Sequence, residues 1–248
     1  MNHLINEIES YPFDKLRRLL SSVNPNKKDN DLINLSIGEP KKRASREVLK
    51  ILAKNKELFS QYPPLGSMNA LNSSYKGYLK KRFNIKEVSN DNILNLGGTR
   101  EGTFSVIQSL FNKKIKSAKP FVLMPNPFYQ IYGGAALLAG GISKQINLNE
   151  DNNFSLDLDS VKEDVWKKCQ IFVACSPSNP TGNVMKKDEI RKIIKLSRKY
   201  EFYIVSDECY IDIYRESKPH SFIETSYKEF GNFKNIVSLH SLSKRSNL

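Results

Sequence analysis

Short apolar runs alternate with helical patterns over the second half of the chain, and this alternation restricts the possible folds more than any other feature. The runs are Phe121–Met124, Ile142–Leu148, Gln170–Cys175, Phe202–Ser206 and Ile236–Leu239. The segments between them have helical periodicity, at Tyr129–Ala139, Val161–Lys167 and, most clearly, Lys187–Tyr200. Nearly continuous apolar strands separated by helices predict an α/β fold with a mostly parallel sheet and helices on both faces.

The first half of the chain has a different pattern, in which helices are separated by polar or proline-containing segments. Helices are predicted at Tyr11–Leu20, Ala44–Phe59, Ala70–Phe83 and Thr99–Asn112, and short strands at Leu32–Ile37 and Ile93–Leu96. We therefore divide the chain into residues 1–34, an N-terminal arm or small-domain segment, and residues 35–248, a large domain.

The chain is strongly basic, which raises nucleic acid and anionic membranes as partners. Its 39 lysines and arginines against 26 acidic residues give a net charge of +13. These cations alternate with apolar residues, as on the solvated face of amphipathic helices, and no nucleic-acid-binding motif accompanies them. No apolar run reaches the roughly 18 residues of a membrane span, and the start lacks a signal-peptide pattern. We expect a cytoplasmic protein that binds neither nucleic acid nor membrane.

The cysteines and histidines give no metal-binding pattern. They lack CxxC pairing and ligand spacing: Cys169, Cys175, Cys209, His3, His220 and His240. We expect reduced thiols and no metal ion.

Three polar segments directly follow predicted strands, where ligands bind in parallel α/β sheets. Gly97-Gly98 opens a helix, so the backbone can approach a ligand closely and the free amides favour a phosphate. Ser176–Gly182, with two prolines and a glycine, can hold the Asn179 amide in one orientation. Asp207 places a carboxylate at a strand end. Taken singly, each segment is equally consistent with an ordinary turn or strand end. Lys244, taken singly, is consistent with a solvated surface lysine.

Five segments resemble, in the same order, the class I and II aminotransferases, which are pyridoxal-phosphate (PLP) enzymes of fold type I. They are Gly97–Arg100, Asn126–Tyr129, Asn179–Gly182, Asp207–Tyr210 and Ser241–Lys244, and the resemblance runs from about Leu32 to Leu248. It implies PLP as the cofactor, amino-acid and keto-acid substrates with glutamate as donor, and a homodimer.

The resemblance also implies catalytic roles for Lys244, Asp207 and Tyr210. Lys244 would hold PLP as a Schiff base and then move the substrate α-proton. Asp207 would keep the pyridine nitrogen protonated, so that the ring accepts electrons. Tyr210 and Asn179 would hydrogen-bond the phenolic oxygen of the ring, and Tyr129 would stack on its face.

The remaining implied residues bind the phosphate or the substrate. The phosphate would be held by Gly98, Thr99, Arg100, Ser241 and Ser243. Tyr62 resembles the tyrosine that reaches the phosphate of the partner subunit. Gly38, together with Asn179, is implied to lie near the substrate carboxylate.

Within the family, three segments resemble the succinyldiaminopimelate aminotransferases of lysine biosynthesis. They are Tyr11–Arg17, Gly97–Gly102 and Ser243–Asn247. This narrower resemblance implies N-succinyl-2-amino-6-ketopimelate as the keto acid. The alternatives are another aminotransferase or a carbon–sulfur lyase of the same fold.

Two arginines of the family have no counterpart in the sequence. One binds the phosphate from a position beyond the lysine, and one, in a C-terminal small domain, binds the substrate carboxylate. Arg245 matches neither position. We therefore expect an N-terminal part of a longer enzyme, with an incomplete large domain, no C-terminal small domain and exposed apolar surface. An inactive fragment is the alternative for the chain as written.

Overall fold

The sheet of this protein has five strands, all parallel. The computed structural model describes residues 2–8, 10–23, 35–62, 68–114 and 120–248. The strands are β1 (Phe121–Asn126), β2 (Ile142–Asn147), β3 (Cys169–Cys175), β4 (Tyr203–Asp207) and β5 (Ile236–Leu239), in the spatial order β2-β1-β3-β4-β5. Every neighbouring pair runs parallel. The predicted α/β class and parallel sheet are confirmed.

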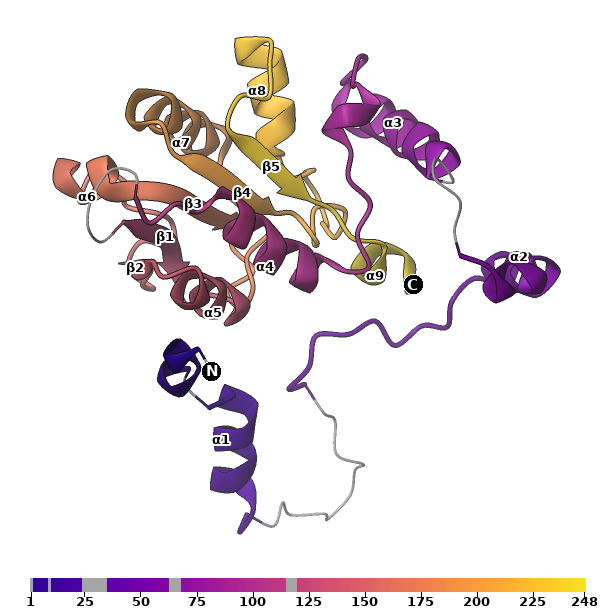
Figure 1. Cartoon of the computed structure of the whole chain (residues 1–248), viewed down its shortest axis with the longest axis horizontal. Helices are drawn as coiled ribbons and strands as arrows, with labels where there is room; N and C mark the ends of the chain where they lie inside the picture. Colours follow the sequence, from indigo (N-terminus) through magenta and orange to yellow (C-terminus); the bar gives the residue numbers. More distant parts are fainter. Residues whose placement is uncertain (1, 9, 24–34, 63–67, 115–119) are drawn as a thin grey trace.

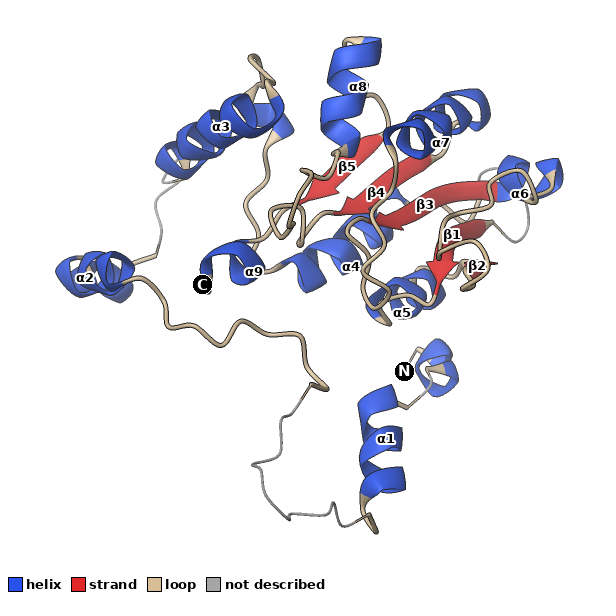
Figure 2. Cartoon of the chain, turned by 180° about the vertical axis from the view of Figure 1, so that it is seen from behind, coloured by secondary structure: helices blue, strands red, loops and turns tan. Residues whose placement is uncertain are grey.

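Helices cover both faces of the sheet (Figures 1 and 2). One face packs against α4 (Thr99–Leu110) and α5 (Ile131–Leu138), and the other against α6 (Glu163–Lys168), α7 (Lys187–Tyr200) and α8 (Phe222–Phe230). β3 is buried along its whole length because its side chains alternate between the two cores, Phe172 toward α7 and Val173 toward α5. The prediction of helices on both faces is therefore confirmed.

The part of the chain before α4 contributes helices and no strand in its described residues. They are η1 (His3–Glu7), α1 (Pro12–Leu20), α2 (Arg46–Lys54), η2 (Lys56–Ser60), α3 (Asn69–Phe83) and η3 (Asn90–Asn92). The helix α3 packs through Leu79 and Phe83 against Ile211, beyond the end of β4. No side chain of α1 or α2 is buried. None of the described helices combines the length and apolarity that crossing a bilayer requires.

Both strands predicted in the N-terminal half are absent from the described residues. Residues 32–34 lie outside them, and residues 35–37 form no strand. Ile93–Leu96 is extended but pairs with no neighbouring strand, and its Leu94 is 79% exposed. An alternating pattern gives an apolar face but supplies no hydrogen-bonding partner, and without one the segment stays a connection. The helix predicted over Ala44–Phe59 ends at Lys54, where the Asn55 side chain bonds the carbonyl of Ile51 at 2.8 Å.

Two short helices near the C-terminal end were not predicted. The helix α8 begins at a capping box, in which Ser221 and Glu224 each satisfy the other's backbone amide. The helix α9 (Leu242–Ser246) follows β5 and carries Lys244. Ser221-x-x-Glu224 is a sequence signal that predicts α8, whereas α9 is too short for a periodic pattern.

Candidate cofactor-binding site

Asp207 is a buried carboxylate at the carboxyl end of β4, which lies between β3 and β5 in the sheet. Only 8% of its surface is exposed. The Tyr132 hydroxyl donates to Oδ2 at 2.7 Å, and the Cys209 backbone amide donates to Oδ1 at 3.2 Å. No cationic side chain pairs with it within the described residues. Two neutral donors leave its charge uncompensated, so this position favours a ligand with a positive charge or a proton to share.

The groups around Asp207 have their pKa values raised. Burial, and then the charge of Asp207, raise the pKa of the Cys175 thiol to about 12. Burial is likewise the largest cause at Tyr210, followed by Cys175 and Asp207, and the pKa of this phenol is about 12. Both groups therefore keep their protons at neutral pH. The Tyr210 hydroxyl is available as a hydrogen-bond donor.

Lys244 lies on α9 beside Tyr210 and the carbonyl of Gly38. Its Nζ donates to the Gly38 oxygen at 2.5 Å, across more than 200 residues of sequence. The same Nζ lies 5.8 Å from the centroid of the Tyr210 ring. The structure thus brings together one predicted catalytic pair, Lys244 and Tyr210, and the predicted substrate-binding glycine.

The start of α4 brings another predicted group together. Gly98 is the N-cap residue and Thr99 begins the helix, so the free amides of the first turn point away from the helix at this end. Arg100 Nε donates to the Tyr129 hydroxyl at 2.6 Å, and the Cys209 thiol donates to Thr99 Oγ1 at 3.1 Å. A helix start with an adjacent guanidinium is suited to an anion such as a phosphate.

A second short helix start carries Ser241 and Ser243. Ser241 Oγ caps α9 by accepting from the Ser243 amide at 3.2 Å, and the two hydroxyls share a hydrogen bond of 2.8 Å. Both hydroxyls are therefore held close to the turn that precedes Lys244.

A continuous chain of contacts links the helix start to the buried carboxylate. From Arg100 it passes to the Tyr129 hydroxyl and then to the Tyr132 ring, which meets Tyr129 edge to face with centroids 5.9 Å apart. The Tyr132 hydroxyl completes the chain at Asp207. Sequence reasoning missed Tyr132, although its spacing of one helical turn from Tyr129 was visible.

Two predicted residues are not brought into this group. Tyr62 is 97% exposed, and the structure gives it no contact with the other site residues. The Asn179 side chain is also exposed, although its backbone lies within hydrogen-bonding reach of the Cys175 sulfur. The roles predicted for Tyr62 and Asn179 stay predictions.

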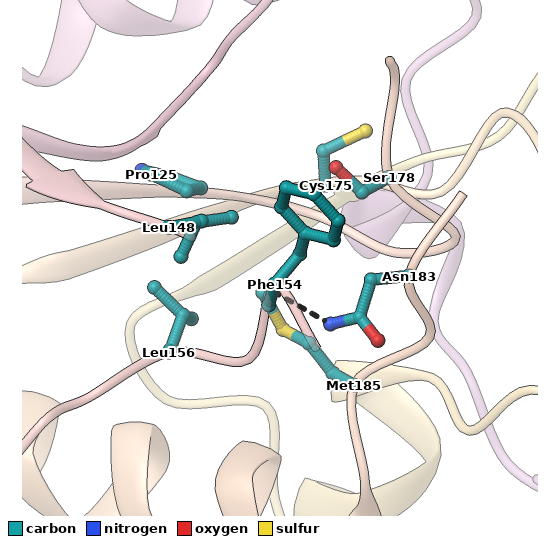
Figure 3. A pocket seen from close by; sticks show the side chains of 8 residues that line it. All are labelled: Pro125, Leu148, Phe154, Leu156, Cys175, Ser178, Asn183 and Met185. Atoms are coloured by element: carbon teal, nitrogen blue, oxygen red, sulfur yellow. Dashed lines mark hydrogen bonds between the residues drawn. The ribbon is translucent and has the colours of Figure 1, made fainter. Parts of the chain in front are cut away.

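A small apolar cavity lies beside the ends of β1 and β3 (Figure 3). Its lining comprises Pro125, Leu148, Phe154, Leu156, Cys175, Ser178, Asn183 and Met185. The Asn183 side chain closes it by donating to the Phe154 carbonyl at 3.0 Å (Figure 3). With a volume of about 10 Å³ it has room for no more than one water molecule, so it is not the cofactor site. Elsewhere in the described chain, no three histidine, cysteine or acidic side chains gather as metal ligands.

The residues at the carboxyl edge of the sheet fit pyridoxal phosphate. Asp207 presents an uncompensated buried carboxylate for the ring nitrogen, Tyr210 a protonated phenol, and the start of α4 free amides for a phosphate. Lys244 supplies a primary amine at the same edge. A parallel sheet with this set of groups defines the fold-type I class of PLP enzymes.

Comparison with known proteins identifies the family. Residues 30–248 match "Aminotransferase class I and II", a family of PLP-dependent enzymes. The chain belongs to this family.

Relatives and solved structures agree with this assignment. The chain is 31% identical, over 96% of its length, to the LL-diaminopimelate aminotransferase of Syntrophobacter fumaroxidans, 59% of which is covered. An aminotransferase structure from Neisseria meningitidis has a TM-score of 0.91 and 34% identity, with 100% of this chain and 63% of that one covered. A probable N-succinyldiaminopimelate aminotransferase from Thermus thermophilus has a TM-score of 0.75 and 27% identity, with 88% and 56% covered. The chain thus spans about 60% of the length of its relatives.

Proposed function

We propose that this chain supplies the cofactor-binding part of an enzyme that transfers an amino group between an amino acid and a keto acid. The observation that carries the proposal is the buried Asp207 carboxylate, without a cationic partner among the described residues, at the edge of the sheet where Lys244 also lies. A buried carboxylate with a purely structural role would be expected to have a cationic partner within the protein. A carboxylate whose cationic partner is the protonated ring nitrogen of a bound cofactor needs none from the protein.

PLP, when bound, supplies an electron sink for negative charge on the substrate α-carbon. In our proposal Lys244 Nζ would hold the cofactor, and as a free amine it would move the proton at the α-carbon. Asp207 holds the proton at the ring nitrogen, and Tyr210 donates a hydrogen bond to the phenolic oxygen. Asn179 assists Tyr210, and Tyr129 covers the ring.

The phosphate of the cofactor is proposed to bind where helix starts and hydroxyl groups meet. The residues are Gly98, Thr99, Arg100, Ser241 and Ser243, with Tyr62 contributed by a partner subunit. The full exposure of Tyr62, and the absence of buried side chains on α1 and α2, support a homodimer in which these segments pack against the second copy. Light scattering of the purified protein tests this, and a monomer at all concentrations contradicts it.

For the substrate, we propose a keto acid of the diaminopimelate type, with glutamate as the amino donor. N-succinyl-2-amino-6-ketopimelate is the first candidate, supported by the likeness to the Thermus thermophilus enzyme. The likeness to an LL-diaminopimelate aminotransferase favours the unsuccinylated compound as the second candidate. Assays of the two acceptors with glutamate separate these candidates. If the enzyme uses neither acceptor but transaminates aspartate or releases a thiol from its substrate, both candidates are contradicted.

Lysine trapping tests the cofactor site. The protein is mixed with PLP, reduced with borohydride and digested, and the modified lysines are mapped by mass spectrometry. We expect the phosphopyridoxyl group on Lys244, with its loss in Lys244→Ala. Lys234→Ala, which removes an exposed lysine after α8, is the matched control and is expected to keep the label at Lys244. Equal labelling spread over surface lysines would contradict the proposal and favour an inactive fragment.

A further inference from the structure

Glu208, the residue after Asp207, is a second buried carboxylate with a different set of partners. It is 1% exposed. Its oxygens accept hydrogen bonds from the Phe222 amide at 2.9 Å, from the hydroxyls of Ser206 and Ser238, and from His240 Nε2 at 2.8 Å. Burial opposes ionisation of Glu208, but the hydrogen bond and electrostatic attraction of His240, together with hydrogen bonds from Ser221 and the Phe222 amide, hold its pKa below the usual value. Glu208 is therefore ionised and tied to the end of β5.

His240 carries this connection onward to α3. Its Nδ1 lies 2.6 Å from the Tyr75 hydroxyl, and its ring stacks on Phe83 at a centroid distance of 5.8 Å. Tyr75 and Tyr78 meet the same ring edge to face. The chain Glu208–His240–Tyr75 thus joins the ends of β4 and β5 to α3, with 165 positions of sequence between Tyr75 and His240.

A second connection to α3 begins at Arg245. Its Nη1 lies 3.0 Å from Asp212 Oδ2, and Asp212 also accepts from the Tyr78 hydroxyl at 3.1 Å and from Arg82 Nε at 2.9 Å. The Arg245 guanidinium lies 4.8 Å from the centroid of the Tyr78 ring. Lys244 therefore lies between two residues, His240 and Arg245, that are both bound to the same face of α3.

The Glu208 contacts also relate Lys244 to Asp207. The Glu208 amide donates to the Leu239 carbonyl at 2.9 Å, and Asp207 is the register partner of Leu239. The strand that ends at Asp207 and the strand that leads to Lys244 are thus joined through backbone and side chain at one point. A displacement of His240 would move the turn before Lys244 relative to Asp207.

We propose that Tyr75, His240 and Arg245 are positioning residues, which fix Lys244 relative to Asp207 by binding the segment around the lysine to α3. None of them needs to touch the cofactor or the substrate. The proposal rests on the proposed role of Lys244. It assigns to α3 a function in the site, although no residue of this helix belongs to the predicted site.

The test compares Tyr75→Phe with Tyr227→Phe. Tyr227 packs in the same cluster, and its hydroxyl has no hydrogen-bond partner among the described residues, so the control removes the same atom without breaking the chain. Each protein is trapped with PLP and borohydride after increasing times of incubation, and the rate at which Lys244 is labelled is measured. Thermal unfolding of the same samples is followed in parallel. We expect Tyr75→Phe to lower the rate of Lys244 labelling about fivefold, the scale of one hydrogen bond, while Tyr227→Phe labels at the native rate.

Arg245→Ala is the second variant, because this partly exposed side chain can be removed without disturbing the core. We expect it to slow Lys244 labelling in the same direction. Native labelling rates in both Tyr75→Phe and Arg245→Ala, with or without a loss of thermal stability, would overturn the positioning role. Absence of label on Lys244 in the unsubstituted protein would instead overturn the proposed function on which the inference rests.

Discussion

The Tyr132 hydroxyl and the Asp207 carboxylate are joined by a buried hydrogen bond of 2.7 Å. Burial is the largest cause that raises the pKa of Tyr132 well above the usual value, and the electrostatic interactions with Cys175 and Asp207 add to it. The phenol therefore remains a hydrogen-bond donor at neutral pH. This bond orients the carboxylate from α5, on the face of the sheet opposite α8.

Tyr132→Phe is expected to destabilise the protein. It removes one of the two donors to a buried charged group, and such hydrogen bonds contribute about 1.5–3 kcal/mol. Denaturant unfolding measures the loss. Tyr203→Phe, on the same strand as Asp207 but partly exposed, is the control and is expected to change the free energy of unfolding by less than about 0.5 kcal/mol. Equal effects of the two substitutions would show that the bond contributes nothing.

Asp207→Asn is expected to lower the pKa of Tyr210. The negative charge of Asp207 disfavours the phenolate, so its removal brings the pKa down from about 12, while burial keeps it above the usual 10.0. The difference in tyrosinate absorbance between this variant and its Tyr210→Phe counterpart isolates the group. An unchanged titration would mean that the charge of Asp207 does not contribute to the raised pKa of Tyr210.

Glu229 is expected to make the protein sensitive to acid at the contact between α7 and α8. The hydrogen bond from Arg191 is the main cause that lowers its pKa from 4.5 to about 2. A depressed carboxylate pKa contributes stability above the unfolded-state value, and that stability is lost as pH falls from about 4.5 toward 2. Glu229→Gln should therefore reduce the difference in unfolding free energy between pH 7 and pH 3, measured in urea. Glu216→Gln, which removes the charge of an exposed carboxylate outside this contact, serves as the control.

Two glycine-to-alanine substitutions are expected to have opposite signs. At Gly141 a new Cβ would lie 2.4 Å from Cζ of the Phe111 ring, so we expect a loss of about 1–3 kcal/mol from overpacking. At Gly77, within α3, nothing lies within 4 Å of the new atom. There the gain in helix propensity is expected to stabilise the protein by about 0.5–1 kcal/mol. Thermal unfolding of both variants checks the signs, and destabilisation by Gly77→Ala would contradict the account.

The sequence predicts the elements whose stabilising contacts are local or repeat along the element. Residues 187–200 were predicted as a helix and form α7 with the same bounds, because its apolar stripe and acidic first turn are both visible in the chain. Ile93–Leu96 was wrong as a strand, because strand formation depends on a partner that alternation cannot reveal. The packing of α3 on the strand ends also depends on residues far away in sequence.

For the site, too, the residues with a local sequence signal were predicted, and those defined by distant partners were missed. Asp207 and the Gly98 turn were predicted from their places after strands, and the family resemblance added Lys244 and Tyr210. Tyr132 and Glu208 were missed, since a buried phenol or carboxylate has no distinguishing sequence pattern until its partner is known. His240 was considered only as a possible metal ligand and rejected as one, and its contacts with a carboxylate and a phenol were not predicted.

Adjacent acids at the end of β4 bond on opposite sides of the sheet, Asp207 to Tyr132 and Glu208 to the first amide of α8. Successive side chains of a strand point to opposite faces of the sheet, so the position of each acid along the chain decides which partners it meets. A deletion or insertion of a single residue in β4 would exchange them, so that the acid paired with histidine would face the ligand side. The chain would keep both carboxylates, yet lose the distinction between them. For this reason, tolerated changes in β4 should be substitutions, and length variation should occur in the connections on either side.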